Sequence, residues 1–160
     1  MRMRVLFKLV LALVSASFFS SHVAGQALTL KNLKTNETGV VNPTGKLSVV
    51  MLFQPDCSWC KKQEKALSTI HASCTSTFNF HIVGTQGSRN QLKRELNHYH
   101  QNISAYKSTT QFLRQVGGFK ASPTTLFFDA SGTLLGKRRG YLELLKMKQL
   151  INSLTYNKCE

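Results

Sequence analysis

Leu52-Phe53-Gln54-Pro55-Asp56-Cys57-Ser58-Trp59-Cys60-Lys61-Lys62 is a strand-to-helix junction that carries two cysteines three positions apart. The unpaired N–H groups and the positive dipole end of a helix favour an anion at its first turn. A thiolate at Cys57 is therefore stabilised, which lowers the pKa of that thiol and makes it a nucleophile near neutral pH. Cys60 lies one turn further along the same face, where it can attack a mixed disulfide formed at Cys57. The pair is thus predicted to cycle between dithiol and disulfide.

The cysteine pair has two other possible roles, as half of a structural zinc site or as a static disulfide. A structural zinc site needs four ligands, usually as a second closely spaced pair, but Cys74 and Cys159 are far apart in the sequence. The histidines show no metal-site spacing and no sequence relation to Cys57, so we interpret them as surface or strand residues: His71, His81, His98 and His100. We predict no metal site. A static Cys57–Cys60 disulfide remains the alternative to redox chemistry.

The N-terminal residues indicate export. Residues 1–4 are basic, residues 9–19 are apolar, and small residues follow up to Gly25, as in a secretory signal peptide. The apolar run is short for a membrane span. We therefore predict a signal peptide over residues 1–25, cleaved near Gly25, and a periplasmic location. An uncleaved membrane anchor is the alternative.

The chain is strongly basic, with 21 Lys and Arg against 7 Asp and Glu and a formal net charge of +14. Such a charge favours acidic partners, anionic membranes or nucleic acid. The basic residues are scattered rather than set among stacking aromatics, so nucleic acid is not an expected partner. We expect a monomer that meets cysteine-containing envelope proteins and a redox partner protein.

Hydrophobic periodicity predicts one domain over residues 46–160, preceded by an extension or first strand over residues 26–45. Four strands are expected, over residues 47–53, 78–84, 122–129 and 134–138. Four helices are expected, beginning at Cys57, after caps at Ser88 and Ser104, and after Gly140. The first of them has a buried stripe of Cys60, Gln63, Leu67, Ile70 and Cys74, with Lys61, Lys62, Glu64 and Lys65 mostly off it.

This order of elements resembles the thioredoxin superfamily over Lys46 to Tyr156. The resemblance is carried by Phe53, by Cys57-Ser58-Trp59-Cys60-Lys61 at the junction, by Ser122-Pro123-Thr124 before a late strand, and by Gly132 and Gly140. It implies an α/β thioredoxin fold, with a central mixed β-sheet flanked by helices on both faces. Residues 85–118 are then a helical insertion before the proline-led strand, either inert or part of a partner-binding surface.

The resemblance also implies how a substrate is held. Pro123 would be a cis proline lying against Cys57, and the backbone of Ser122 would pair with an incoming peptide as an extra strand. Cys57 would attack a substrate disulfide, and Cys60 would release the product without a bound cofactor. Trp59 is either a hydrophobic platform for substrate or a packed aromatic.

Three positions depart from the family pattern. Met51 stands where thioredoxin-type reductases commonly carry a buried acid, Ser58-Trp59 replaces Gly-Pro, and Lys65 replaces a helix-kinking proline. Without the acid, proton removal from Cys60 has no evident internal base. This favours an oxidase or isomerase over a reductase and leaves the direction of electron flow open.

The remaining cysteines acquire a role through the same resemblance. In this fold the first and the closing helix lie on one face of the sheet and run away from the active site. Cys74 ends the first and Cys159 follows the second, so a structural Cys74–Cys159 disulfide is expected. A buried free Cys74 and a free Cys159 thiol are the alternative.

The sequence therefore predicts an exported thiol–disulfide oxidoreductase that exchanges disulfides with protein substrates. The alternative is a non-catalytic secreted binding module with a static Cys57–Cys60 disulfide and a basic partner-binding surface.

Overall fold

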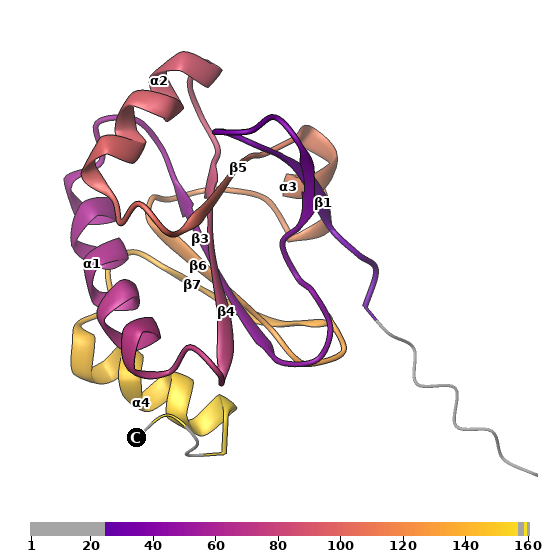
Figure 1. Ribbon diagram of the computed structural model, residues 1–160, viewed down its shortest axis with the longest axis vertical. Coiled ribbons are helices and arrows are strands. Elements are labelled where there is room, and N and C mark those ends of the chain that lie inside the picture. Colours follow the sequence, from indigo (N-terminus) through magenta and orange to yellow (C-terminus); the bar gives the residue numbers. More distant parts are fainter. Residues whose placement is uncertain (1–24, 157–158, 160) are drawn as a thin grey trace, which may run out of the picture.

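The computed structural model describes residues 25–156 and residue 159 (Figure 1). The predicted signal peptide therefore lies outside the described residues, except for Gly25. The strands are β1 Thr29–Asn32, β2 Thr38–Val40, β3 Leu47–Phe53, β4 Phe78–Gly84, β5 Ser104–Lys107, β6 Thr124–Phe128 and β7 Leu134–Arg139. The helices are α1 Ser58–Ser73, α2 Arg89–Glu95, the 3-10 helix η1 Leu96–His98, α3 Thr110–Gln115 and α4 Leu144–Leu154.

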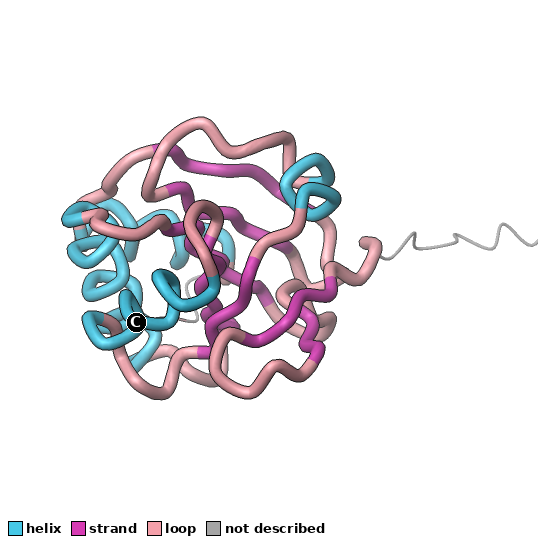
Figure 2. The backbone as a smooth tube through the Cα atoms, turned by 90° about the horizontal axis from the view of Figure 1, so that it is seen from above, coloured by secondary structure: helices cyan, strands magenta, loops and turns pink. Residues whose placement is uncertain are grey.

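The strands of the described part of the chain form one mixed sheet in the order β2-β1-β5-β4-β3-β6-β7. β3 pairs in parallel with β4 and antiparallel with β6. Helices α1, α2 and α4 cover one face, and α3 covers the other, as Figures 1 and 2 show. The expected central mixed sheet with helices on both faces is confirmed.

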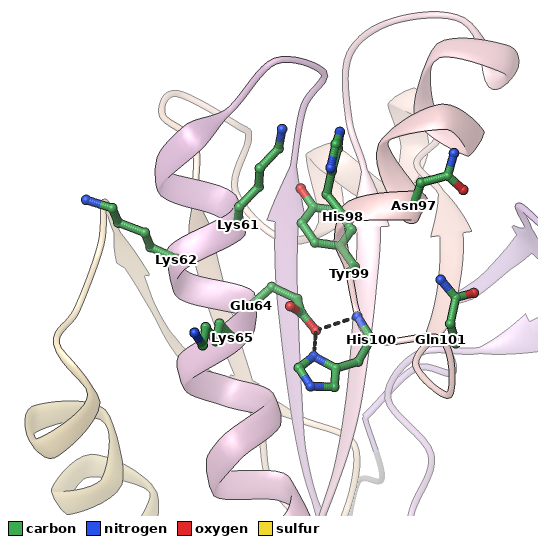
Figure 3. Close-up of a pocket in the computed structure, with 9 residues that line it drawn as sticks. All are labelled: Lys61, Lys62, Glu64, Lys65, Asn97, His98, Tyr99, His100 and Gln101. Atoms are coloured by element: carbon green, nitrogen blue, oxygen red, sulfur yellow. Dashed lines mark hydrogen bonds and ion pairs between the residues drawn. The ribbon is translucent and has the colours of Figure 1, made fainter.

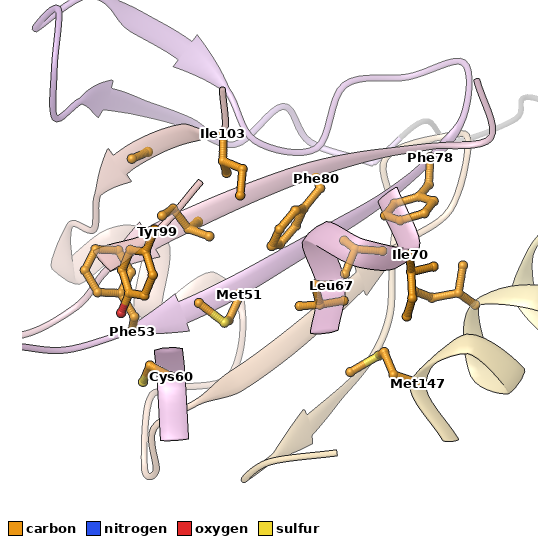
Figure 4. Close-up of a cluster of buried hydrophobic side chains, with 14 of the residues drawn as sticks. Met51, Phe53, Cys60, Leu67, Ile70, Phe78, Phe80, Tyr99, Ile103 and Met147 are labelled. Carbon is orange, nitrogen blue, oxygen red and sulfur yellow. The ribbon is translucent and has the colours of Figure 1, made fainter. Parts of the chain in front are cut away.

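Strand β3 lies at the centre of the molecule, and all seven of its residues are buried. Because side chains alternate along a strand, Met51 and Phe53 contribute to the core under α1 and α4 (Figure 4), while Val50 and Leu52 contribute to the core under α3. A strand buried on both faces is typical of a sheet covered by helices. The junction after β3 is therefore held on a rigid support.

The N-terminal extension joins the same sheet. The expected first strand is present as β1, which pairs antiparallel with both β2 and β5. β2 was not expected, because residues 34–46 have the composition of turns. Tertiary pairing forms this three-residue strand at the edge of the sheet despite weak local propensity.

The prediction of a helix capped by Ser104 is wrong. Ser104 opens β5, which lies between β4 and β1. Register pairing of His81 with Ser104, and of Asn32 with Tyr106, overrides the helical spacing of the apolar residues. The helix begins later, where the Thr109 hydroxyl accepts a hydrogen bond from the Phe112 N–H at 3.1 Å.

The helix predicted after Ser88 is confirmed as α2. The Ser88 hydroxyl accepts from the Gln91 N–H at 3.3 Å, and the Gln91 side chain accepts from the Ser88 N–H at 2.8 Å. The helix ends at Glu95 and continues as η1. Residues 85–118 thus add a strand inside the sheet as well as helices.

No helix in the described ranges combines the length and the apolar character that a membrane span requires. At the far edge of the sheet, β7 carries Lys137, Arg138 and Arg139.

Candidate functional site

Cys57 caps the N-terminus of α1. The turn from β3 passes through Asp56, whose φ of 57° places it in the left-handed region. Cys57 then has extended backbone angles, and its Sγ accepts a hydrogen bond from the Cys60 N–H at 3.1 Å. Sulfur therefore occupies the place that a Ser or Asp oxygen takes in an ordinary N-cap. The structure confirms that the first cysteine sits over the open N–H groups of the helix.

The two cysteines are joined by a disulfide, with their Cα atoms 5.2 Å apart. Cys60 is completely buried, whereas 8% of Cys57 remains exposed. Cys57 is therefore the more accessible of the two, while Cys60 belongs with Met51 to the core under α1 (Figure 4).

The loop before β6 lies directly against the disulfide. The peptide bond between Ser122 and Pro123 is cis, and Pro123 is buried. The Ser122 Oγ lies 3.0 Å from the Cys60 Sγ and 3.6 Å from the Cys57 Sγ. Register pairing of Leu52 with Thr124 explains the contact, because it brings the start of β6 beside the end of β3. The sequence assigned Ser122 a backbone role; its side-chain contact with both sulfurs was not foreseen.

Trp59 forms part of an exposed aromatic surface beside the cysteines. Half of the side chain is exposed, at 52%, and its ring lies 5.5 Å from that of Tyr141 between centroids. Lys62 Nζ lies 4.5 Å above the indole ring. Tyr141 is held there because the Gln63 Oε1 accepts from the Leu142 N–H at 2.7 Å. The ring of Trp59 is thus half exposed and also packs against Tyr141.

Met51 lies beneath the site, fully buried, and its register partner Thr125 has a buried hydroxyl with no hydrogen-bond partner among the described residues. A carboxylate approaches instead from α2. Glu95 Oε1 accepts from the Asp56 N–H at 3.2 Å, and its Oε2 lies 4.0 Å from Lys61 Nζ. Sequence reasoning missed Glu95, although it follows Leu92 by three positions and so shares the buried face of α2.

Tyr99 packs at the same side of the site, with its ring 5.2 Å from Phe53 and nearly perpendicular to it. Burial, reinforced by the nearby carboxylates of Glu95 and Glu64, raises the pKa of Tyr99. Its phenol therefore stays neutral, and its hydroxyl has no hydrogen-bond partner within the described residues.

The expectation that Glu64 lies off the buried stripe of α1 is wrong. Its side chain is only 2% exposed, and Oε1 accepts from the Ser68 hydroxyl at 2.6 Å and from the His100 N–H at 3.1 Å. His100 Nδ1 also lies 3.0 Å from the same oxygen (Figure 3). The stripe is wider than the sequence indicates, because the loop after η1 covers it. The other stripe residues are buried as expected: Cys60, Gln63, Leu67, Ile70 and Cys74.

Cys74 and Cys159 are bonded to each other, with Cα atoms 5.3 Å apart. Both are buried, at 2% and 1% exposure. They lie at the opposite end of α1 from Cys57, about 25 Å along a helix of this length. These cysteines therefore cannot join the Cys57–Cys60 pair in one four-cysteine metal site.

Among the described residues, no histidine contacts Cys57 or Cys60. His71 packs against Phe78 at the end of α1, and His98 is exposed. His81 lies on β4 with its ring 5.8 Å from Tyr106. Burial, with a smaller contribution from His71, lowers the pKa of His81 to about 4. Within the described residues, no three His, Cys, Asp or Glu side chains cluster closely enough to hold a metal ion.

A family model described as a thioredoxin-like domain matches residues 35–155, most of the chain. The chain belongs to this thioredoxin-like family. The matched residues include the Cys57–Cys60 junction and the Ser122–Pro123 loop. No curated protein sequence matches the chain significantly.

Solved structures share this thioredoxin-like fold at low sequence identity. The pneumococcal exposed lipoprotein thioredoxin from Streptococcus pneumoniae is 18% identical, with a TM-score of 0.69 over 81% of this chain and 100% of that one. A secreted Mycobacterium tuberculosis disulfide oxidoreductase is 16% identical, with a TM-score of 0.67 over 80% and 96%. A thiol:disulfide interchange protein from Chlorobium tepidum is 16% identical, with a TM-score of 0.70 over 82% and 95%.

Proposed function

We propose that this protein is an exported thiol–disulfide oxidoreductase that acts on protein substrates, with Cys57 as the nucleophile and Cys60 as the resolving thiol. The observation that carries the proposal is the position of the Cys57 sulfur, which is the helix cap and the more exposed of the two. Membership of the thioredoxin-like family and the redox names of its structural neighbours support it.

In the reducing direction the two cysteines themselves supply the electrons, so the reaction needs no cofactor. The Cys57 thiolate attacks a substrate disulfide, forming a mixed disulfide and expelling one substrate sulfur, which takes up a proton. The Cys60 thiolate then attacks the Cys57 sulfur. The second substrate sulfur leaves and is protonated, so the substrate becomes a dithiol and the Cys57–Cys60 disulfide forms. The oxidising direction is the reverse.

The N–H and hydroxyl groups around the pair stabilise the reduced form. The Cys60 N–H already points at the Cys57 Sγ, and the Ser122 hydroxyl lies within reach of both sulfurs. Hydrogen bonds to an anion and the helix dipole lower the pKa of a thiol, so Cys57 is favoured as the leaving group and nucleophile. A stabilised thiolate makes the disulfide more oxidising.

Substrate positioning is assigned to Trp59, Ser122 and Pro123. The exposed indole ring offers apolar area two residues after Cys57, and Ser122, in the loop with Pro123, has its hydroxyl 3.6 Å from the Cys57 sulfur. A substrate chain laid between them would present its disulfide to Cys57. Replacing Trp59 with Ala removes the platform while keeping both thiols.

Export and domain boundaries are part of the proposal. Residues 1–25 would be removed, and residues 26–45 and 46–160 would fold together in the periplasm as a monomer. The pairing of β1 with β5 supports one folding unit, because the extension completes the sheet of the larger segment.

The deciding experiment is the reduction potential of the Cys57–Cys60 pair, measured by equilibration with glutathione and read through Trp59 fluorescence. A potential of about −120 to −180 mV would make the protein an oxidase or isomerase, as the apolar Met51 favours. A value near about −270 mV would make it a reductase. Failure to equilibrate would support the static binding module instead.

A trapping experiment identifies the nucleophile independently. With Cys60→Ser, the mixed disulfide at Cys57 cannot be resolved, so a substrate from the same compartment should accumulate as a covalent adduct. Cys57→Ser is the matched control and should trap nothing through the first step. An adduct that forms equally with both variants would contradict the assigned order of attack.

A further inference from the structure

A shallow groove of about 590 Å³ runs along α1, between that helix and the η1 segment with the loop after it (Figure 3). On the helix side it is lined by Lys61, Lys62 and Lys65. On the other side it is lined by His98 and His100, among polar side chains. The groove is thus a cationic surface formed by two segments that are distant in the sequence.

The two acids at the groove, Glu64 and Glu95, are buried and not accessible to a ligand. Glu64 lies on its floor, but its side chain is 2% exposed and its Oε1 is engaged by Ser68 and His100. The Nζ of Lys61 is 4.0 Å from Glu95, at the limit of an ion pair and partly exposed. Lys65 is exposed. The accessible charge of the groove is therefore positive.

The groove begins at the active-site turn. Lys61 follows Cys60 directly. On the other side of the cysteines, the Asp56 N–H donates to Glu95 Oε1, and Glu95 Oε2 lies 4.0 Å from Lys61 Nζ. Lys65 is eight residues after Cys57, about 12 Å along the helix axis. An extended chain rises about 3.3 Å per residue, so about four residues span that distance.

We propose that this groove binds an acidic stretch of the substrate polypeptide, located two to four residues from the cysteine that reacts with Cys57. The proposal rests on the exchange function and adds the substrate's chemistry to it. Side-chain carboxylates would pair with Lys61 and Lys65 while the substrate sulfur lies at Cys57. The groove has no exposed stacking aromatic, since Tyr99 is 5% exposed, so a polypeptide fits better than nucleic acid.

The test uses three synthetic peptides with the same disulfide and flanks of four Glu, four Gln or four Lys. At low ionic strength, we expect the Glu peptide to exchange with the full mature protein about tenfold faster than the Gln peptide. The difference should shrink to less than about twofold in high salt, because the charges are exposed.

Matched variants locate the effect in the groove. Lys61→Gln/Lys65→Gln should slow the Glu peptide about three- to tenfold more than it slows the Gln peptide. Lys31→Gln/Lys148→Gln removes the same charge from β1 and α4 and should leave both rates within about twofold. Equal rates for the Glu and Gln peptides would overturn the proposal. An equal loss in both double variants would also overturn it, since attraction would then come from net charge.

Equilibrium binding of a Glu-flanked peptide without cysteine separates this proposal from the exchange function. If no peptide disulfide reacts but Lys61→Gln/Lys65→Gln weakens this binding, the exchange function fails and the acidic docking surface stands. If the variant instead weakens binding only to anionic vesicles or to an oligonucleotide, the groove belongs to that ligand and the proposal is wrong.

Discussion

The two ends of α1 each carry a disulfide, in opposite surroundings. At the N-terminus, Cys57 and Cys60 are three residues apart, with N–H and hydroxyl donors against their sulfurs and an edge open to solvent. At the C-terminus, Cys74 and Cys159 are 85 residues apart and buried in the core. A sulfur stabilised as an anion and open to solvent is suited to exchange, and one buried away from solvent is suited to holding the chain together. Position along one helix separates the two roles.

The largest effect expected from this comparison is on exchange. Cys57→Ser should reduce the rate with a peptide disulfide by about a thousandfold or more, because a hydroxyl is not ionised near neutral pH and forms no mixed disulfide. The rate is measured with dithiothreitol as reductant. Cys74→Ser/Cys159→Ser should keep the rate within about threefold at a temperature where it is folded. A large loss of exchange rate in Cys74→Ser/Cys159→Ser would contradict the assignment of separate roles to the two disulfides.

For stability, removing the Cys74–Cys159 disulfide should have a larger effect than removing the Cys57–Cys60 disulfide. Cys74→Ala/Cys159→Ala opens a loop with a sequence separation of 85 and should lower the free energy of unfolding by about 4 kcal/mol in the chain-entropy model. Cys57→Ala/Cys60→Ala, with a separation of three, should cost about 2 kcal/mol or less. Urea unfolding at constant m-value gives both numbers. A greater cost at the active site would contradict the comparison.

Acid sensitivity is expected from neither disulfide but from His81, on β4. The pKa of His81 is about 4 in the folded protein, below its ordinary value of 6.5, so the unfolded chain binds the proton first. Stability should therefore fall as the pH drops from about 6.5 to 4, by about 3 kcal/mol. His81→Phe should remove most of this loss in urea unfolding at pH 7 and pH 4. His98→Gln changes an exposed histidine instead, and this control variant should lose as much stability at pH 4 as the wild type.

The smallest effect concerns the Ser122 hydroxyl. Ser122→Ala removes a donor 3.0 Å from one sulfur and 3.6 Å from the other, which should raise the pKa of the reduced pair. The exchange rate at neutral pH should fall about fivefold, corresponding to about 1 kcal/mol. Ultraviolet absorbance of the thiolate follows the titration. Ser122→Thr keeps a hydroxyl and should stay near the wild-type rate; equal losses in both variants would point to packing instead.

Much of the fold is readable from the sequence because its signals are local. The strand over residues 47–53, the helix after Cys57 and the capped α2 follow from apolar runs, periodicity and capping residues. The pairing of Cys74 with Cys159 was reached through the family resemblance, since cysteine spacing alone leaves several pairings open. The bond in the structure agrees with that expectation.

The parts missed depend on contacts between distant segments. Ser104 and the residues after it become a strand because β1 and β4 flank them, and no local pattern records that. Glu64 is buried because His100 arrives from another segment to pair with it. Glu95 likewise comes from a distant segment, α2, and accepts a hydrogen bond from the Asp56 N–H in the active-site turn. A single sequence gives the face of a helix but not what covers it.

The outer strands of the sheet bear on whether two copies of the chain can pair edge to edge. β2 has only three residues, and β7 ends in the cations Lys137, Arg138 and Arg139. A short edge and a charged edge are poor templates for pairing with another chain. The two edges of the sheet therefore disfavour strand pairing between copies of the chain, whether the cysteines are reduced or oxidised.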